Sequence, residues 1–210
     1  MSPTLARRSF ALAGAAALAA VAFSAPSFAQ LVREPAAVQA GTYKVEPNHT
    51  RVLFAVNHMG FSTWYGNFTH ASGGLTLDPA KPEASSLSVT VPTASVETTN
   101  TVLDGELKSA DWLDAAKYPT VSFKSSKVTL TGPGQADVAG ELTLHGVTKP
   151  VVLHAKFNGA GVNPLDKAYT VGFEVSGKIK RSDFGVTKYV PLIGDDVDMI
   201  ISAAFEKQAG

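Results

Sequence analysis

Cysteine is absent from all 210 residues of the sequence. Without thiols the chain forms no disulfide, uses no cysteine nucleophile, and holds no iron–sulfur cluster and no cysteine-ligated zinc ion. Its stability must therefore come from packing and from backbone hydrogen bonds. A chain of this length can bury a core large enough for that purpose.

A surplus of positive charge is also absent, because 18 lysines and arginines balance 18 aspartates and glutamates. Beyond the N-terminus the basic residues are scattered along the chain and form no basic stripe. A protein that binds nucleic acid needs a concentrated basic surface to neutralise phosphates. We therefore expect no nucleic-acid partner.

Apolar runs are short except at the N-terminus, where residues 10–23 follow Arg7 and Arg8. This run is too short and too rich in alanine to span a bilayer stably. It leads to Ser27-Phe28-Ala29, a small-x-small pattern of the kind that signal peptidase cleaves. We predict that residues 1–29 are a cleaved export signal peptide and that the mature protein is periplasmic. The arginine pair suits either the Sec or the twin-arginine route.

After residues 30–40, which we expect to be a flexible spacer, apolar and polar residues alternate in runs of strand length. A period of two is typical of strands with one buried face. Segments rich in glycine, proline and asparagine separate the runs and predict turns, among them residues 72–74, 146–150 and 158–161. The main alternating apolar positions are Val52, Phe54, Val56, Leu75, Leu77, Leu87, Val89, Val91, Val121, Phe123, Val128, Leu130, Leu142, Leu144, Val151, Leu153, Ala155, Phe157, Tyr169, Val171, Phe173, Val175, Val197, Met199, Ile201, Ala203 and Phe205.

One segment, residues 101–118, has apolar residues at helical spacing, and Asp111 within it can cap a second short helix. Elsewhere the short connections favour antiparallel neighbours. About eight such strands can stack as a sandwich or close into a barrel, and closure removes the exposed edges that invite aggregation. We predict an all-β fold, a single antiparallel barrel of about eight strands over residues 41–207, with a short helical segment near residues 101–118.

A barrel of this size can be filled by its own side chains or can hold one small ligand. Met199-Ile200-Ile201 is apolar on both faces, and Gly66, Gly140, Gly172 and Gly177 lie within strand patterns, which favours a cavity. Alternatively, the glycines mark bulges and barrel corners, and the interior is filled. The residues by themselves leave both interpretations open.

Few residues combine into a catalytic or metal site. His49 and His58 are nine positions apart and would point to opposite faces of a continuous strand. Asp196 and Asp198 share a face and could chelate a hard cation, although carboxylates at the start of a strand commonly face solvent. We expect no catalytic residue and no metal ion.

A pair of charged residues, Arg181 and Asp183, lies just after a predicted strand. These side chains could bind a polar head group. A structural ion pair or a turn cap is the alternative.

Seven blocks follow one another along the chain, at residues 49–58, 66–68, 107–113, 118–123, 140–151, 181–185 and 194–195. The most specific is Gly140-Glu141-Leu142-Thr143-Leu144-His145-Gly146-Val147-Thr148-Lys149-Pro150-Val151. Taken together in this order, the blocks resemble the YceI-like family of exported polyisoprenoid-binding proteins. The resemblance covers essentially the whole chain from residue 41 onward.

The resemblance implies a lipocalin-like barrel whose apolar tunnel holds a long isoprenoid lipid, such as a polyprenyl compound or a ubiquinone-like molecule. It implies no other cofactor, no metal and no catalysis. It also makes a membrane cytochrome of the b561 type a candidate partner of a monomeric or homodimeric carrier. Strand parity, which does not fix the inward face, and the resemblance together give these candidate ligand-binding residues: Phe54, Val56, His58, Phe68, Val89, Val91, Leu107, Trp112, Leu113, Phe123, Leu142, Leu144, Phe157, Phe173, Val175, Arg181 and Asp183.

One segment departs from the family pattern, which reads Arg-Asp-x-His-Leu where this chain has Leu103-Asp104-Gly105-Glu106-Leu107. The loss of a cation and an imidazole favours a neutral, quinone-like or amide head over a pyrophosphate. Two other functions stay open at this point. The protein could be a hydrolase or other enzyme acting on a prenyl or acyl compound, or a non-catalytic stress-related structural module with a solid barrel.

Overall fold

Strands account for most of the chain in a computed structural model that describes residues 31–209. The predicted signal peptide lies outside the described residues. The helical elements are α1 (Thr101–Lys108) and four short 3-10 turns, η1 (Pro35–Ala37), η2 (Pro82–Ala84), η3 (Thr93–Ser95) and η4 (Arg181–Phe184). The strands are β1 (Gly41–Val45), β2 (Arg51–His58), β3 (Ser62–Phe68), β4 (Ser72–Leu77), β5 (Ser86–Pro92), β6 (Val96–Glu97), β7 (Thr120–Gly132), β8 (Gln135–Leu144), β9 (Val147–Val162), β10 (Tyr169–Lys180) and β11 (Ile193–Lys207).

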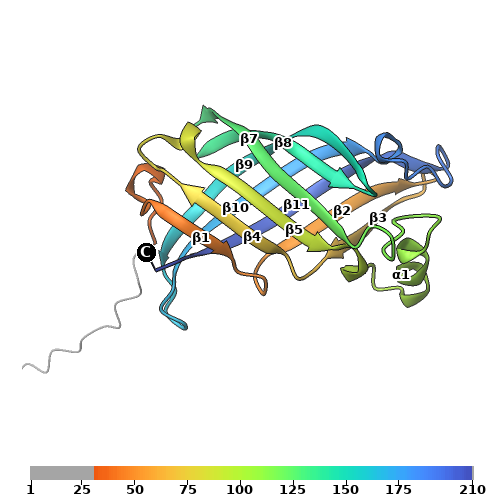
Figure 1. Cartoon of the computed structure of the whole chain (residues 1–210), viewed down its shortest axis with the longest axis horizontal. Helices are drawn as coiled ribbons and strands as arrows, with labels where there is room; N and C mark the ends of the chain where they lie inside the picture. The colour runs from red at the N-terminus through yellow and green to blue at the C-terminus, as the bar shows by residue number, and fades with distance from the viewer. Residues whose placement is uncertain (1–30, 210) are drawn as a thin grey trace, which may run out of the picture.

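Eight of these strands form a closed antiparallel barrel (Figure 1). They follow one another in the order β1-β4-β5-β7-β8-β9-β10-β11, and β11 pairs back with β1. Most neighbours are joined by hairpins, as the short connections predict, and closure leaves few strand edges free. The prediction of an antiparallel barrel of about eight strands with one short helix is confirmed.

Strand β11 changes partner along its length, from β2 over its first part to β1 near its end. At the change Ala204 has no strand partner on this side, and two groups from the β1–β2 connection take its hydrogen bonds. The Ala204 amide donates to Thr50 Oγ1 (3.1 Å), and the Ala204 carbonyl accepts from the Glu46 amide (2.9 Å). The ladder therefore continues across the break without an unpaired backbone group.

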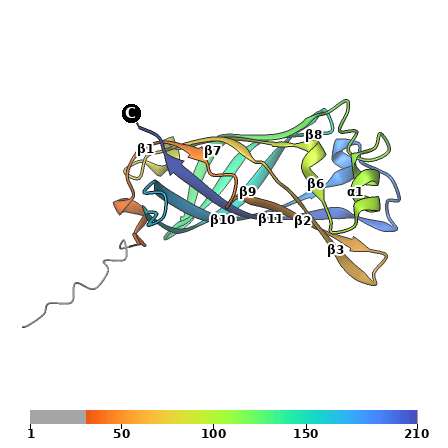
Figure 2. The ribbon, with the colours of Figure 1, turned by 90° about the horizontal axis from the view of Figure 1, so that it is seen from below.

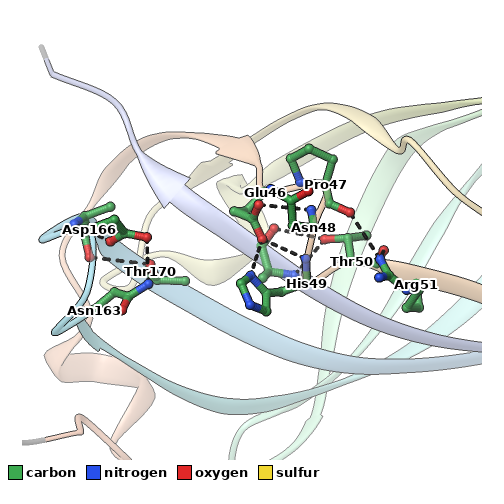
Figure 3. A network of polar contacts seen from close by, with 11 residues as sticks. Glu46, Pro47, Asn48, His49, Thr50, Arg51, Asn163, Asp166 and Thr170 are labelled. Carbon is green, nitrogen blue, oxygen red and sulfur yellow. Dashed lines mark hydrogen bonds and ion pairs between the residues drawn. The ribbon is translucent and has the colours of Figure 1, made fainter.

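The same connection is held by the Glu46 carboxylate (Figure 3). It accepts hydrogen bonds from the backbone amides of Asn48 (2.9 Å) and His49 (2.7 Å) and contacts His49 Nδ1. Burial raises the pKa of Glu46, but these hydrogen bonds outweigh burial and hold the pKa below its usual range. The turn is thus tied to an ionised glutamate.

Side chains fill the end of the barrel that holds β1. Tyr43 and Val171 are completely buried there, beside Val45 and Phe205. The N-terminal segment packs on the same end, where Val32 pairs with Ala160 and Val38 is buried in the cluster. Residues 31–40 therefore lie against the barrel, which differs from the flexible spacer that we expected, because their two valines find apolar partners.

Turns occupy different residues from those predicted in three places. The β8–β9 turn is His145-Gly146 and not residues 146–150, because both residues have positive φ (53° and 74°) and Leu144 pairs with Val147. This two-residue geometry matches the twist of a hairpin. Residues 72–74 and 158–161 lie inside β4 and β9. At Gly73 a β-carbon would lie 2.1 Å from the Ser88 carbonyl oxygen, so glycine serves close strand packing there.

Helix α1 begins after Asn100, whose side chain accepts hydrogen bonds from the amides of Val102 and Leu103. The predicted second helix does not form. Residues 109–117 are turns and irregular chain, and Asp111 forms an ion pair with Lys188 instead of capping a helix. Within residues 31–209, every helix is too short or too polar to cross a bilayer.

Candidate functional site: an apolar cavity inside the barrel

A cavity of about 240 Å³ occupies the barrel from its middle to the end that holds α1. The hollow between the surrounding atom surfaces is wider than this inner volume. The residues that line it come from strands all round the barrel and from the α1 segment. They are Thr50, Val52, Leu53, Phe54, Val56, Phe68, Leu87, Val89, Val91, Leu107, Trp112, Leu113, Val121, Ser122, Phe123, Leu142, Leu144, Val151, Leu153, Val175, Ile179, Arg181, Val186, Ile193, Val197, Met199, Ile201 and Ala203.

All but four of the candidate ligand-binding residues line this cavity. Their contact with a ligand stays a prediction, but the inward faces follow the expected parity. The residues brought together are Phe54, Val56, Phe68, Val89, Val91, Leu107, Trp112, Leu113, Phe123, Leu142, Leu144, Val175 and Arg181.

The four other candidates lie elsewhere. Phe157 and Phe173 pack against each other with tilted rings, 5.8 Å apart between centroids, and they belong to the packed β1 end beneath the cavity, because β10 and β9 continue past its floor. His58 lies against Trp64, with the rings 5.9 Å apart. Asp183 is exposed on η4.

Two of the four strand glycines make room for aromatic rings that line the cavity. A β-carbon at Gly66 would lie 2.3 Å from Phe54 Cζ, and one at Gly140 would lie 2.5 Å from Phe123 Cζ. The ends of these rings therefore occupy the space that a side chain would take at glycine positions on neighbouring strands. Gly172 marks a register shift between β9 and β10, so the bulge interpretation holds at that site.

Several lining residues were not among the candidates. The largest group lies on β11, where Val197, Met199, Ile201 and Ala203 alternate into the lumen. Their parity was visible in the sequence, so the same rule could have included them. Val186 belongs to the irregular loop before β11, and Ile193 begins β11 directly after that loop, so no periodicity indicates these two positions.

Arg181 is the charged group that lines the cavity, and its side chain is only 5% exposed. Its guanidinium donates to the carbonyl oxygens of Gly194, Val186 and Ile193, each at 2.9 Å. Burial lowers the pKa of Arg181, and the nearby Asp195 opposes that effect. The arginine thus holds the loop before β11 in place, and it makes no ion pair with Asp183.

The turn cap in this region is Asp195. Its carboxylate accepts from the Ser182 amide (2.9 Å) and from the Ser182 hydroxyl (2.8 Å), which lowers its pKa. The other polar side-chain groups among the lining residues are the indole N–H of Trp112 and the hydroxyls of Thr50 and Ser122, and Thr50 is already bonded to Ala204. Little of the lumen is free to bind a polar group.

Asp196 and Asp198 of β11 lie beside lysines of the neighbouring strand β10. Asp198 lies 3.1 Å from Lys178 and Asp196 lies 3.3 Å from Lys180, each pair in direct register between β10 and β11. These carboxylates are on the outer surface with their own counter-ions. Residues 31–209 contain no cluster of three or more histidines or carboxylates that could hold a metal ion.

Two segments meet over the α1 end of the cavity, residues 109–117 and the loop from η4 to β11 (Figure 2). The Trp112 ring packs edge-on against Tyr189 (6.1 Å) and lies 5.4 Å from the Arg181 guanidinium. The ion pair between Lys188 and Asp111 joins the same segments. Because the β1 end is packed solid, a ligand must enter through this end.

The length of the lumen follows from β11, whose lining residues run from Ile193 to Ala203. Ten residue steps at about 3.3 Å, tilted by about 40° from the axis, give about 25 Å. An extended chain advances about 1.2 Å per bond, so about 20 bonds fit along this distance. Spread over that length, the volume suits one hydrocarbon chain.

Residues 43–205 match the family model described as the YceI-like domain. The chain is 44% identical over 154 residues to a UPF0312 protein of Ectopseudomonas mendocina, covering 73% of this chain and 80% of that protein. It is 41% identical over 178 residues to Protein YceI of Escherichia coli O6:H1, covering 84% of this chain and 92% of the relative.

Solved structures with the same barrel include Burkholderia cenocepacia BcnA, with a TM-score of 0.69 and 26% identity over 76% of this chain and 98% of BcnA. The Campylobacter jejuni YCEI protein has a TM-score of 0.64 and 33% identity, covering 73% of this chain and 90% of its own. A Saccharophagus degradans domain described as polyisoprenoid binding has a TM-score of 0.59. At 15% identity, over 81% of this chain and all of that domain, the last likeness concerns the fold alone.

Proposed function

The chain belongs to the family of YceI-like domains, and we propose that it is a periplasmic, non-catalytic carrier that holds one long isoprenoid lipid in its barrel. The observation that carries this proposal is the lining of the cavity. Of the 28 residues that form it, only Thr50, Ser122 and Arg181 bring a hydroxyl or a charge. The ligand class described for the Saccharophagus domain agrees with the proposal.

An apolar lining of this length can bind a lipid tail tightly. A chain of about 25 carbons, five isoprene units, gains on the order of 20 kcal/mol from leaving water, at about 0.8 kcal/mol per carbon. The loss of translational and rotational freedom on association and the ordering of the flexible tail oppose binding by roughly 4–15 kcal/mol of free energy. The surplus supports firm binding without polar contacts in the lumen.

A hydrolase is less well supported, because catalysis needs polar groups that converge at one point in the cavity. None of the five histidines, all within the described part of the chain, lines it. His58, a candidate ligand-binding residue, packs on the Trp64 ring instead. A purely structural barrel is also less well supported, because a cavity remains beyond the packed β1 end.

We infer that the lipid carries a neutral head. Leu103 and Glu106 replace the basic residues of the family pattern, and Glu106 is exposed on α1. The nearest buried cation, Arg181, already donates to three carbonyl oxygens. A pyrophosphate would therefore meet no free cation among the residues that line the lumen, and it would lie close to a segment in which acidic residues outnumber lysines.

Trp112 provides an assay, because it lines the cavity while Trp64 does not. Delipidated protein is titrated with a prenyl quinone and with a prenyl pyrophosphate of equal length, and tryptophan fluorescence is followed. We expect saturable quenching by the quinone at one equivalent and at least tenfold weaker binding of the pyrophosphate. Trp112→Phe is the control that removes the signal. Absence of binding by either lipid would rule out the carrier, and preference for the pyrophosphate would rule out the neutral head.

Export to the periplasm has its own test. Processing after Ala29 would make Gln30 the first residue of the mature chain. N-terminal sequencing of protein recovered from a periplasmic extract should read Gln-Leu-Val-Arg. An intact N-terminus in the cytosolic fraction would contradict export.

A further inference from the structure

Three exposed segments surround the α1 end of the barrel and carry large apolar side chains. The β2–β3 turn carries Met59 and Phe61, which are 48% and 88% exposed. The loop before β11 carries Tyr189 and Leu192, which are 56% and 62% exposed, and α1 carries Val102 at 72%. We call these five residues the apolar rim. Soluble proteins rarely expose so many large apolar side chains around one opening without a partner.

The rim is continuous with the cavity. The Met59 amide donates to the Leu192 carbonyl oxygen (3.0 Å), so the β2–β3 turn and the loop before β11 are adjacent. Tyr189 packs in turn on Trp112, which lines the cavity. A lipid that passes through this end of the barrel would therefore leave the lumen between rim residues.

The β2–β3 turn presents its side chains rigidly. The Phe61 amide donates to the His58 carbonyl oxygen (3.0 Å), and the Gly60 amide donates to Asn57 Oδ1 (2.7 Å). The hairpin projects from the barrel, so Phe61 stands at a convex tip (Figure 2). A convex tip with one aromatic ring suits insertion into a soft surface better than a flat protein interface, which needs matched shape.

Two of the three rim segments, the β2–β3 turn and residues 189–194, carry no charged side chain. No aspartate, glutamate, lysine or arginine occurs between Arg51 and Asp78, or from Tyr189 to Gly194. Around α1, the acidic residues Asp104, Glu106, Asp111 and Asp114 outnumber the lysines Lys108 and Lys117. Insertion of the hairpin tip and of residues 189–194 would thus desolvate no charge, and these segments offer no basic patch to attract anionic lipid.

We propose that the apolar rim docks on the surface of a phospholipid bilayer, with Phe61 and Leu192 inserted among the lipids and the cavity facing the membrane. Tyrosine and other aromatic side chains favour this interfacial zone. The purpose of docking rests on the proposed lipid carriage, because the cargo would pass between membrane and lumen without crossing water. The geometry of the apolar rim is independent of the proposed lipid carriage.

The test is flotation of the mature protein with phosphatidylcholine vesicles. We expect the wild type to float with the vesicles equally at 0.1 M and 1 M salt, since no charge pair is involved. The double variant Phe61→Ser with Leu192→Ser should bind at least tenfold more weakly. Leu165→Ser is the matched control, because Leu165 is 90% exposed on the β9–β10 connection at the opposite end, and it should bind like the wild type.

A second measurement reports insertion directly. In Phe61→Trp the added fluorescence should shift to the blue with vesicles, and in Leu165→Trp it should not. Failure of the wild type to float, loss of binding in high salt, or equal loss in the Leu165 control would overturn the proposal. If the wild type forms a dimer and does not bind vesicles, and the double variant is monomeric, membrane docking is refuted in favour of self-association.

The same samples separate this proposal from lipid carriage. The double variant should still bind a prenyl quinone in solution with the affinity of the wild type. Vesicle binding by a protein that does not bind the prenyl quinone would refute the lipid-carrier function and leave membrane docking supported. Binding of the prenyl quinone without vesicle binding would refute membrane docking alone.

Discussion

The same substitution at two positions of one strand should have opposite effects if the barrel is hollow at one end and packed at the other. Val171 and Val175 lie on β10, four residues apart, and both point inward. Val171 is completely buried in the packed β1 end, whereas Val175 lines the cavity. We consider Val171→Phe and Val175→Phe.

At Val171 the larger ring has no free space, and overpacking of a filled core costs about 1–3 kcal/mol. At Val175 four added carbons enter a cavity, where burial of apolar surface gains up to about 3 kcal/mol at 0.8 kcal/mol per carbon. The same four carbons displace lipid of equal size. Loss of about 3 kcal/mol of binding free energy corresponds to roughly a hundredfold weaker affinity.

Urea unfolding of delipidated protein measures the first effect, since bound lipid would stabilise the folded state by itself. Val171→Phe should lower the unfolding midpoint, while Val175→Phe should leave it unchanged or raise it. Titration with a prenyl quinone measures the second effect, and there Val175→Phe should be the weaker binder. Equal destabilisation by both substitutions would refute the reasoning, because it would mean that the lumen at Val175 is already filled.

Three further predictions concern the parts that shape the cavity. Gly66→Ala should lower the thermal midpoint by several degrees, because its β-carbon would lie 2.3 Å from Phe54 Cζ. Gly172→Ala, whose β-carbon would lie 3.9 Å from the nearest atom, should leave the midpoint unchanged. Equal midpoints for the two variants would show that the Phe54 ring does not lie over Gly66. Arg181→Met should cost about 3 kcal/mol in urea unfolding, because three buried carbonyl oxygens lose their donor, and a cost near zero would contradict the bracing role. Hydrogen bonds in its turn lower the pKa of Glu46, so its contribution to stability is present near neutral pH and is lost as the pH falls through that lowered pKa. In Glu46→Gln the free energy of unfolding should therefore fall less steeply as the pH is lowered. An equally steep fall in the variant and the wild type would contradict the assignment.

Much of the barrel was predictable because its strands obey one physical rule. Where one face packs inside and the other faces solvent, side chains alternate, and Val121, Phe123, Leu142 and Leu144 follow this rule to the lumen. The same rule extended along β10 reached Phe173, which lies below the cavity, because periodicity gives the face of a strand and not the depth at which a barrel is filled.

Features that depend on contacts between distant segments were not predictable from one sequence. The turn at His145-Gly146 rests on two residues with positive φ, and its first residue is not the asparagine, aspartate or glycine that usually indicates such a turn. Arg181 was a candidate for a head group, but its three carbonyl partners belong to a loop whose path no local pattern indicates. Glycine within strands suggested an empty lumen, whereas Gly66 and Gly140 in fact receive aromatic rings.

Native mass spectrometry of the protein purified without delipidation tests the central claim most directly. The proposal predicts a second mass peak, heavier than the polypeptide by one isoprenoid lipid, with a fragment ladder in steps of one isoprene unit, and loss of that peak in Val175→Phe. A spectrum with only the lipid-free polypeptide, before and after a prenyl quinone is supplied, would contradict the proposal.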